Sequence, residues 1–275
     1  MRAREYIPEK IWIYDYSLFC RCGSILLAWI AFSWDGGLCM QRYPTCLPVN
    51  IQCMPESLPK SLFSLLPYSV QNSLKRSYNA VMRDKIIAKW KKAGSPVPPP
   101  HAVKQAAIAE YALRSGYEIL VETGTFRGEM ILSHLHTFRR IYSIELSTQL
   151  WKNAVRRFRN HKHVILLQGD SADQIGPVVA QLDKPAIFWL DGHYSGGITA
   201  RGVKISPILQ EINTILAQKE FNHILLIDDA RLFTGKGYPT IDELTEYVRS
   251  KDPRYAMENR DDIVRFTIQE RSFTG

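Results

Sequence analysis

The stretch EILVETGTFRG, residues 118–128, indicates the fold of this 275-residue chain. Its first five residues are typical of a short buried strand, and the loop that follows contains Gly124 and Gly128. Two glycines permit a tight turn and the close approach of a ligand. The spacing differs from the G-x-G-x-x-G pattern of dinucleotide-binding enzymes, and the leading acid Glu122 disfavours a pyrophosphate. Glu122 could instead meet a cationic amine, or the loop could be an ordinary strand-to-helix turn.

Short apolar runs alternate with amphipathic segments through the rest of this region. We expect strands at residues 118–122, 141–145, 164–168, 186–190 and 223–227. We expect helices at residues 101–114, 130–138, 147–158, 172–182, 205–217 and 241–250. Two final strands are expected at residues 256–258 and 263–268, the last of them antiparallel. This order predicts an α/β fold with a Rossmann-like, doubly wound, mostly parallel sheet and helices on both faces.

The chain before this domain has a different character. Residues 1–60 contain all five cysteines and show no sustained periodicity, which predicts an irregular N-terminal extension. Residues 61–97 combine a helical pattern with the start of a Pro-rich joint, and we place the Rossmann-like domain at 98–275. The apolar run at 24–34 is shorter than the ~20 residues of a typical membrane span. An odd number of cysteines suits a reducing compartment, so we expect a cytoplasmic protein without stable membrane insertion.

The composition is that of a soluble globular protein, with 45% hydrophobic and 23% charged residues. The net charge of +8 would suit an acidic partner. No nucleic-acid-binding motif is present, so we interpret the charge as a basic enzyme surface and expect no nucleic-acid partner. The sequence leaves a homodimer open.

Acidic residues stand at the ends of successive strands, where parallel sheets bind their ligands. Glu145 ends the second expected strand, 23 residues after Glu122 (145 − 122), and an acid there can accept both hydroxyls of a ribose. Asp170 and Ser171 follow the third strand. Asp170 could accept a hydrogen bond from an adenine amine. The alternatives are a capping or solvated role for Glu145 and a helix cap for Asp170.

The fourth strand is followed by Asp191, and the fifth by Asp228 and Asp229. These strands should be neighbours, so three carboxylates converge. Their mutual repulsion and desolvation need compensation, which a hard cation such as Mg²⁺ or Ca²⁺ supplies. The alternative is that Arg231 and Lys204 neutralise them.

Together these motifs resemble those of class I S-adenosylmethionine-dependent methyltransferases, over roughly residues 100–270. The resemblance implies that the 122–128 loop holds the methionine part of the cofactor, that Glu145 holds the ribose, and that Asp170 lies near the adenine. It implies the cofactor-binding set Glu122, Gly124, Thr125, Gly128, Glu145, Asp170 and Ser171.

The pattern is most similar to the macrocin O-methyltransferase group, which uses Mg²⁺ to hold a substrate diol. The resemblance implies that Asp191, Asp228 and Asp229 are the metal ligands. The group's usual base is an Asp two positions after the first ligand, and this chain has His193 there. A histidine can take a proton near neutral pH, although it could also be a hydrogen-bonded loop residue.

We therefore predict S-adenosylmethionine-dependent methylation of a hydroxyl of a small molecule, such as a sugar, assisted by a divalent metal ion. The alternatives are a metal-dependent hydrolase and a non-catalytic nucleotide-binding module on the same scaffold.

Overall fold

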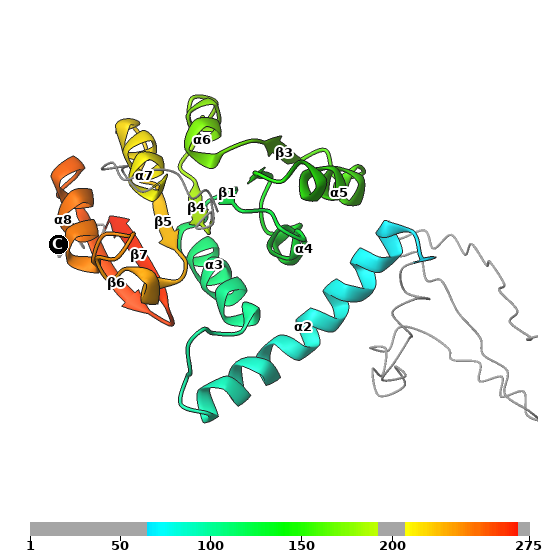
Figure 1. Cartoon of the computed structure of the whole chain (residues 1–275). Helices are drawn as coiled ribbons and strands as arrows, with labels where there is room; N and C mark the ends of the chain where they lie inside the picture. Colours follow the sequence, from blue (N-terminus) through cyan, green and yellow to red (C-terminus); the bar gives the residue numbers. More distant parts are fainter. Residues whose placement is uncertain (1–64, 192–206, 269–275) are drawn as a thin grey trace, which may run out of the picture. The chain divides into compact units, whose positions relative to one another are not determined.

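A computed structural model describes residues 65–191 and 207–268 of the chain (Figure 1). Its helices are α2 (Tyr68–Lys92), α3 (His101–Ser115), α4 (Glu129–His134), α5 (Thr148–Phe158), α6 (Ser171–Val179), α7 (Pro207–Ala217) and α8 (Ile241–Lys251), with the 3-10 turn η2 (Ala230–Leu232). Its strands are β1 (Ile119–Thr123), β2 (Arg140–Glu145), β3 (Val164–Gln168), β4 (Ile187–Leu190), β5 (Ile224–Ile227), β6 (Tyr255–Arg260) and β7 (Ile263–Ile268).

The strands form one seven-stranded sheet in the order β3-β2-β1-β4-β5-β7-β6. The first five strands are parallel, whereas β7 is antiparallel to both β5 and β6. The predicted fold, a mostly parallel sheet with an antiparallel last strand, is confirmed. Because β1 to β5 run in one direction, their carboxyl ends share one edge, where the acidic motifs lie.

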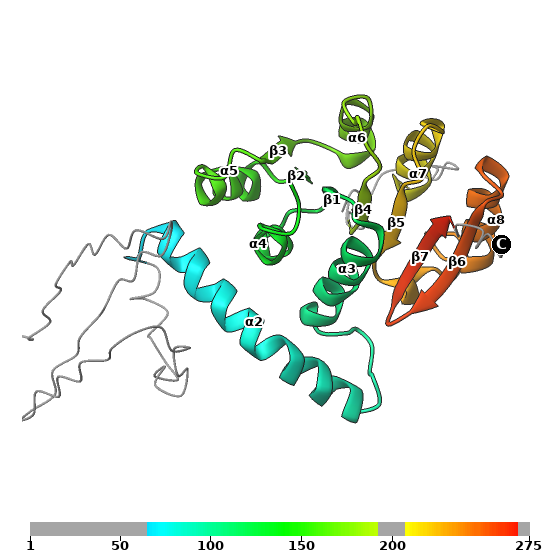
Figure 2. The same cartoon turned by 180° about the vertical axis from the view of Figure 1, so that it is seen from behind.

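Helices cover both faces of the sheet (Figures 1 and 2). Successive strand residues point to opposite faces, and in β1 this divides Leu120 from Val121. Leu120 belongs to a buried apolar cluster with α3, α4 and α5, and Val121 to a second cluster with α6, α7 and α8. Apolar residues of β1, β2, β4 and β5 therefore contribute to two cores, which explains why β4 and β5 are wholly apolar in sequence.

Helix α2 precedes this layered domain. Only two of its residues, Asn72 and Trp90, are buried, although it contacts α3, α4 and α5. The helical pattern expected at 61–94 is thus observed over Tyr68–Lys92, and residues 61–64 lie outside the described part of the chain. Within the described ranges, we find no helix with both the length and the hydropathy of a bilayer-crossing segment. The cysteines and the apolar run at 24–34 also lie outside those ranges.

Candidate functional site

The loop between β1 and α4 depends on its two glycines. Gly124 and Gly128 have φ angles of +89° and +69°. Residues with a Cβ rarely adopt positive φ angles of this size. A Cβ on Gly128 would lie 2.6 Å from Cε2 of Phe158 in α5, so α5 packs directly on the loop backbone. Phe126, between the glycines, also has a positive φ of +46°. The loop is held in shape by its neighbours, because the backbone N–H of Gly124 donates to the carbonyl of Ile144, at 2.9 Å, in β2.

Glu122 lies beneath this loop and is only 2% exposed. Its Oε2 accepts a hydrogen bond of 2.6 Å from the hydroxyl of Ser143, which is itself 2.6 Å from the hydroxyl of Thr125. Burial raises the pKa of Glu122 to about 8, and the nearby charges of Asp191 and Glu145 add to the effect. The carboxyl is therefore protonated at neutral pH in the absence of a cationic neighbour.

Glu145 ends β2 and is 6% exposed. One carboxylate oxygen accepts a hydrogen bond from the backbone N–H of Phe126, at 2.7 Å, and the other from that of Ser147, at 2.9 Å. Glu145 thus joins the glycine loop to the start of α5. Each oxygen has a second lone pair with which a ribose hydroxyl could interact.

Asp170 is the N-cap of α6, and its side chain accepts a hydrogen bond of 3.0 Å from the backbone N–H of Ala172. The helix-cap alternative is therefore observed, and the adenine contact stays a prediction. Ser171 hydrogen-bonds the carboxyl of Glu211 in α7, a buried group whose pKa burial raises to about 7. Sequence reasoning missed Glu211, because it occupies a core position of an amphipathic helix and belongs to no motif.

Three aspartates converge where β4 and β5 end. One oxygen atom from each of Asp191, Asp228 and Asp229 lies within 4.8 Å of the other two. Strands β4 and β5 are parallel neighbours, so their carboxyl ends bring these residues together. Burial and the charges of Asp228 and Asp229 raise the pKa of Asp191 to about 8. The structure thus brings the predicted ligands together, whereas their binding of a metal stays a prediction.

Lys104 of α3 is the principal residue that the sequence did not reveal. Its ammonium donates to Asp228 and lies 3.3 Å from Oδ1 of Asp229. The side chains of Lys104 and Asp228 are only 15% and 0% exposed. No local pattern could have identified this pair, because its members are 124 residues apart in sequence.

Arg231 makes the second cationic contact with the cluster. Its guanidinium lies 2.8 Å from Oδ1 of Asp229 and also donates to the buried carboxylate of Asp262. Together with Lys104 it holds the pKa of Asp229 below its ordinary value despite burial. The neutralisation that we gave as an alternative is therefore partly present through Arg231, while Lys204 lies outside the described residues.

The cations do not balance the acids of this cluster. Four carboxylates, those of Asp191, Asp228, Asp229 and Asp262, face two cationic side chains. The formal charge of the group is −2 (−4 + 2) when all are ionised. The predicted base His193 and the neighbouring residues 194–197 lie outside the described part of the chain.

No protein-family model matches this sequence, and no curated protein matches it. Solved structures with a similar fold include an O-methyltransferase from Bacillus cereus in complex with SAH, with 10% identity over 69% of this chain and 91% of that chain and a TM-score of 0.45. They also include a putative caffeoyl-CoA O-methyltransferase from Staphylococcus aureus, with 12% identity over 72% and 100% of the chains and a TM-score of 0.43. A SAH-bound Podospora anserina methyltransferase has 14% identity over 83% and 100% of the chains and a TM-score of 0.44. At these values the similarity concerns the fold.

Proposed function

We propose that this protein is an S-adenosylmethionine-dependent methyltransferase that acts on a hydroxyl group of a small molecule. The observation that carries the proposal is the arrangement of acids along one edge of the sheet. Glu122 lies near the end of β1, Glu145 ends β2 and Asp170 follows β3, and these three strands are adjacent and parallel. The aspartate cluster continues the same edge at β4 and β5.

The proposed cofactor contacts follow from these positions. The Glu122–Gly128 loop would receive the methionine part, with Thr125 and Gly124 in its backbone turn. A cationic amine near Glu122 would lower the pKa of its carboxyl and make the ionised form the stable one. Glu145 would accept the ribose hydroxyls, and Asp170 and Ser171 would lie near the adenine.

Methyl transfer is a direct displacement. The acceptor oxygen forms a bond to the methyl carbon, the bond from that carbon to the sulfonium sulfur breaks, and the hydroxyl proton must leave. The protein therefore has to align donor and acceptor and to provide a base. We assign the base to His193, whose imidazole can take a proton near neutral pH.

The aspartate cluster fits a hard divalent cation. Its donors are carboxylate oxygens, which Mg²⁺ and Ca²⁺ prefer, and its acids outnumber its cations. A bound cation would favour the ionised form of Asp191, whose pKa is otherwise raised to about 8. Asp191, Asp228 and Asp229 would hold the ion. A bound Mg²⁺ would lower the pKa of an acceptor hydroxyl.

One observation favours a metal-free transferase as the second candidate. Lys104 already contacts Asp228 and Asp229, so an ammonium group supplies part of the positive charge that the cluster needs. In that case Lys104 would stabilise the developing alkoxide of the acceptor. Turnover after removal of divalent metals distinguishes the two candidates, because only the first loses activity.

Calorimetry tests the proposed function. S-adenosylmethionine or its demethylated product should bind, and Glu145→Ala should weaken this binding by about 1–3 kcal/mol, the usual cost of an unpaired buried polar group. The matched control is Glu118→Ala, which removes an acid from the opposite end of β1. Unchanged affinity in Glu145→Ala contradicts the ribose assignment, and preferential binding of NAD contradicts the proposed function.

A further inference from the structure

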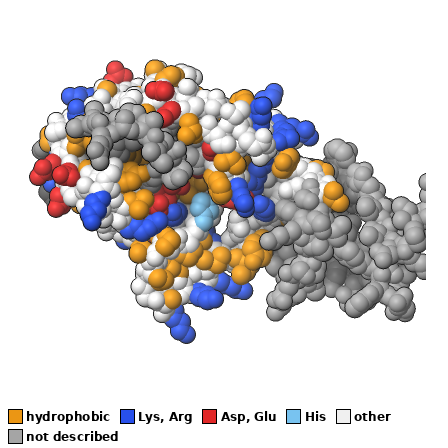
Figure 3. All heavy atoms as spheres, in the orientation of Figure 1, with side chains coloured by type: hydrophobic (Ala, Val, Ile, Leu, Met, Phe, Trp, Pro, Cys, Tyr) orange, Lys and Arg blue, Asp and Glu red, His pale blue; other side chains and the backbone are white. Residues whose placement is uncertain are grey.

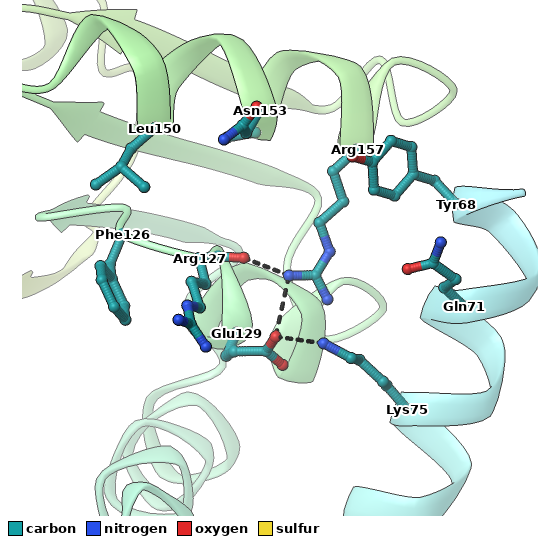
Figure 4. Close-up of a pocket in the computed structure, with 10 residues that line it drawn as sticks. Tyr68, Gln71, Lys75, Phe126, Arg127, Glu129, Leu150, Asn153 and Arg157 are labelled. Carbon is teal, nitrogen blue, oxygen red and sulfur yellow. Dashed lines mark hydrogen bonds and ion pairs between the residues drawn. The ribbon is translucent and has the colours of Figure 1, made fainter. Parts of the chain in front are cut away.

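A cavity of about 280 Å³ lies beside the glycine loop (Figure 4). Its walls come from the first turns of α2, the loop after β1 and one face of α5. Phe126 and Arg127 line it from the loop, whereas none of the seven residues assigned to the cofactor does. Ligand pockets commonly start at roughly 300 Å³, so the cavity has the size for a small organic molecule.

The cavity is positively charged. Three cationic side chains line it, those of Lys75, Arg127 and Arg157, together with one carboxylate, that of Glu129. The same oxygen of Glu129 is shared by Lys75, at 3.0 Å, and by Arg157, at 3.1 Å. The formal charge of the lining is therefore +2 (3 − 1). Lys and Arg side chains also gather on the side of the molecule where α4 and α5 lie (Figure 3).

Arg157 is held rigidly in this lining. Its side chain is 9% exposed, and its Nε donates to the side-chain oxygen of Asn72 at 2.8 Å. Its second terminal nitrogen is buried and has no acceptor among the residues that the structure describes. A fixed guanidinium with an unused donor is ready to bind a planar or tetrahedral oxyanion without further ordering.

Aromatic side chains complete the cavity. Phe126 is 60% exposed although its backbone has the disfavoured φ of +46°, and the guanidinium of Arg127 lies 5.3 Å from its ring centroid. Tyr68 of α2 is 40% exposed and lines the cavity from the other side. In Figure 4 the two rings lie on opposite sides of the charged groups. An organic group could pack against either ring.

We propose that this cavity binds a small phosphomonoester, with its phosphate against Lys75, Arg127 and Arg157 and its organic part against an aromatic wall. A phosphomonoester has close to two negative charges at neutral pH, which matches the charge of the lining, whereas a carboxylate has one. The proposal does not depend on the methyltransferase assignment, because none of the seven residues assigned to the cofactor lines the cavity.

Calorimetry with the full-length protein tests the ligand class. The probes are phenyl phosphate, phenol and inorganic phosphate. Phenyl phosphate should bind saturably at one site, phenol should not bind, and inorganic phosphate should bind more weakly than phenyl phosphate. Absence of phenyl phosphate binding overturns the proposal. Equal affinity for inorganic phosphate overturns the phosphomonoester assignment, because the organic part then contributes nothing.

Two variants locate the binding site. Arg127→Gln should weaken phenyl phosphate binding about tenfold, the effect of one lost charged hydrogen bond. The control is Lys152→Gln in α5, which removes one positive charge at a residue that does not line the cavity. Its affinity for phenyl phosphate should stay within about twofold of that of the natural protein. Equal losses in the two variants overturn the location.

Glu129→Gln should change the affinity for phenyl phosphate in the opposite direction. The substitution removes the carboxylate that pairs with Lys75 and Arg157 and competes with a ligand for them. Binding of phenyl phosphate should therefore become tighter. A loss of affinity in a Glu129→Gln protein with an unchanged circular dichroism spectrum overturns the proposed charge complementarity.

Discussion

At the scale of single residues, Glu122 is the group whose chemistry a ligand would change most. Its carboxyl is buried, hydrogen-bonded to Ser143, and has a pKa of about 8. It therefore holds a proton at pH 7 that a cationic ligand would displace.

This displacement is measurable. Binding of the demethylated cofactor at pH 7 should release a proton, since its amino group favours the ionised form of Glu122. Titration calorimetry in two buffers of different ionisation enthalpy gives the number of protons released. Glu122→Gln should bind without that release, and the same proton count in both proteins argues against contact between the amine and Glu122.

The same pKa makes a prediction about stability. The folded-state pKa of Glu122, about 8, exceeds its ordinary value of 4.5, so the folded protein binds more protons than the unfolded chain between these two values. The contribution of Glu122 to stability is then fully present below pH 4.5 and is lost as the pH rises toward 8. The free energy of unfolding of Glu122→Gln should fall less over this range than that of the natural protein, by up to a few kcal/mol. Denaturant unfolding at a series of pH values measures this difference. Parallel pH profiles for the two proteins contradict the raised pKa.

Lys104 gives a further test of the aspartate cluster. Lys104→Gln leaves Asp228 without its cation, and the variant should be less stable than the natural protein by about 3 kcal/mol in a chelator. Mg²⁺ should then stabilise the variant more than the natural protein, because the cluster is more negative. Thermal unfolding with and without Mg²⁺ measures both effects, and Lys184→Gln, which affects only an exposed pair with Glu118, is the control. If Mg²⁺ stabilises neither protein, the aspartates do not hold this metal.

At this scale the sequence predicted the acids but not their partners. Asp191, Asp228 and Asp229 could be expected to converge because each directly follows a strand, and parallel strand ends share an edge. The contact of Lys104 depends on how α3 packs across the sheet, which no local pattern encodes. Asp170 was ambiguous for another reason, since one side chain can serve equally as a cap and as a ligand contact.

At the scale of elements, strand positions and most helix ends followed closely from the apolar runs, but the helices expected at 130–138 and 172–182 end early. The helix expected at 130–138 ends at His134. Leu135 and Phe138 continue the apolar spacing and are buried, but they pack into the core from the non-helical segment between α4 and β2. The apolar spacing therefore predicted which residues are buried, but it continued past the residue where the helical hydrogen bonds end.

The contact between the glycine loop and α5 can be tested with a matched pair of glycines. Gly128 and Gly116 have the same φ of +69°, but a Cβ on Gly116 would meet no atom within 4 Å. Gly116→Ala should cost about 1 kcal/mol from backbone strain alone, and Gly128→Ala about 1–3 kcal/mol more, because Phe158 must move. Denaturant unfolding measures the difference. Equal losses would show that α5 does not press on the loop.

At the scale of the whole molecule, the sequence indicated a boundary between an irregular extension and the domain. The structure describes the chain only from residue 65 onward, so this boundary stays a prediction. The cysteine-rich first 60 residues have no periodic pattern from which a fold could be inferred.

Removal of the extension tests whether the domain is autonomous. A chain beginning at Ser61 should stay soluble, unfold cooperatively and bind the demethylated cofactor with the affinity of the full-length protein. Circular dichroism and calorimetry provide these measurements. Aggregation, or loss of cofactor binding, would place part of the core or of the site in residues 1–60.

The position of β7 has a consequence for biosynthesis. β7 lies between β5 and β6 in the sheet, although it follows both in the sequence. A ribosome synthesising the chain therefore releases β6 before the strand that connects it to the sheet has been made. Until residues 263–268 leave the exit tunnel, the nascent chain exposes the unpaired edge of β5, a surface to which chaperones can bind. Both outer strands can join the sheet only once β7 has emerged.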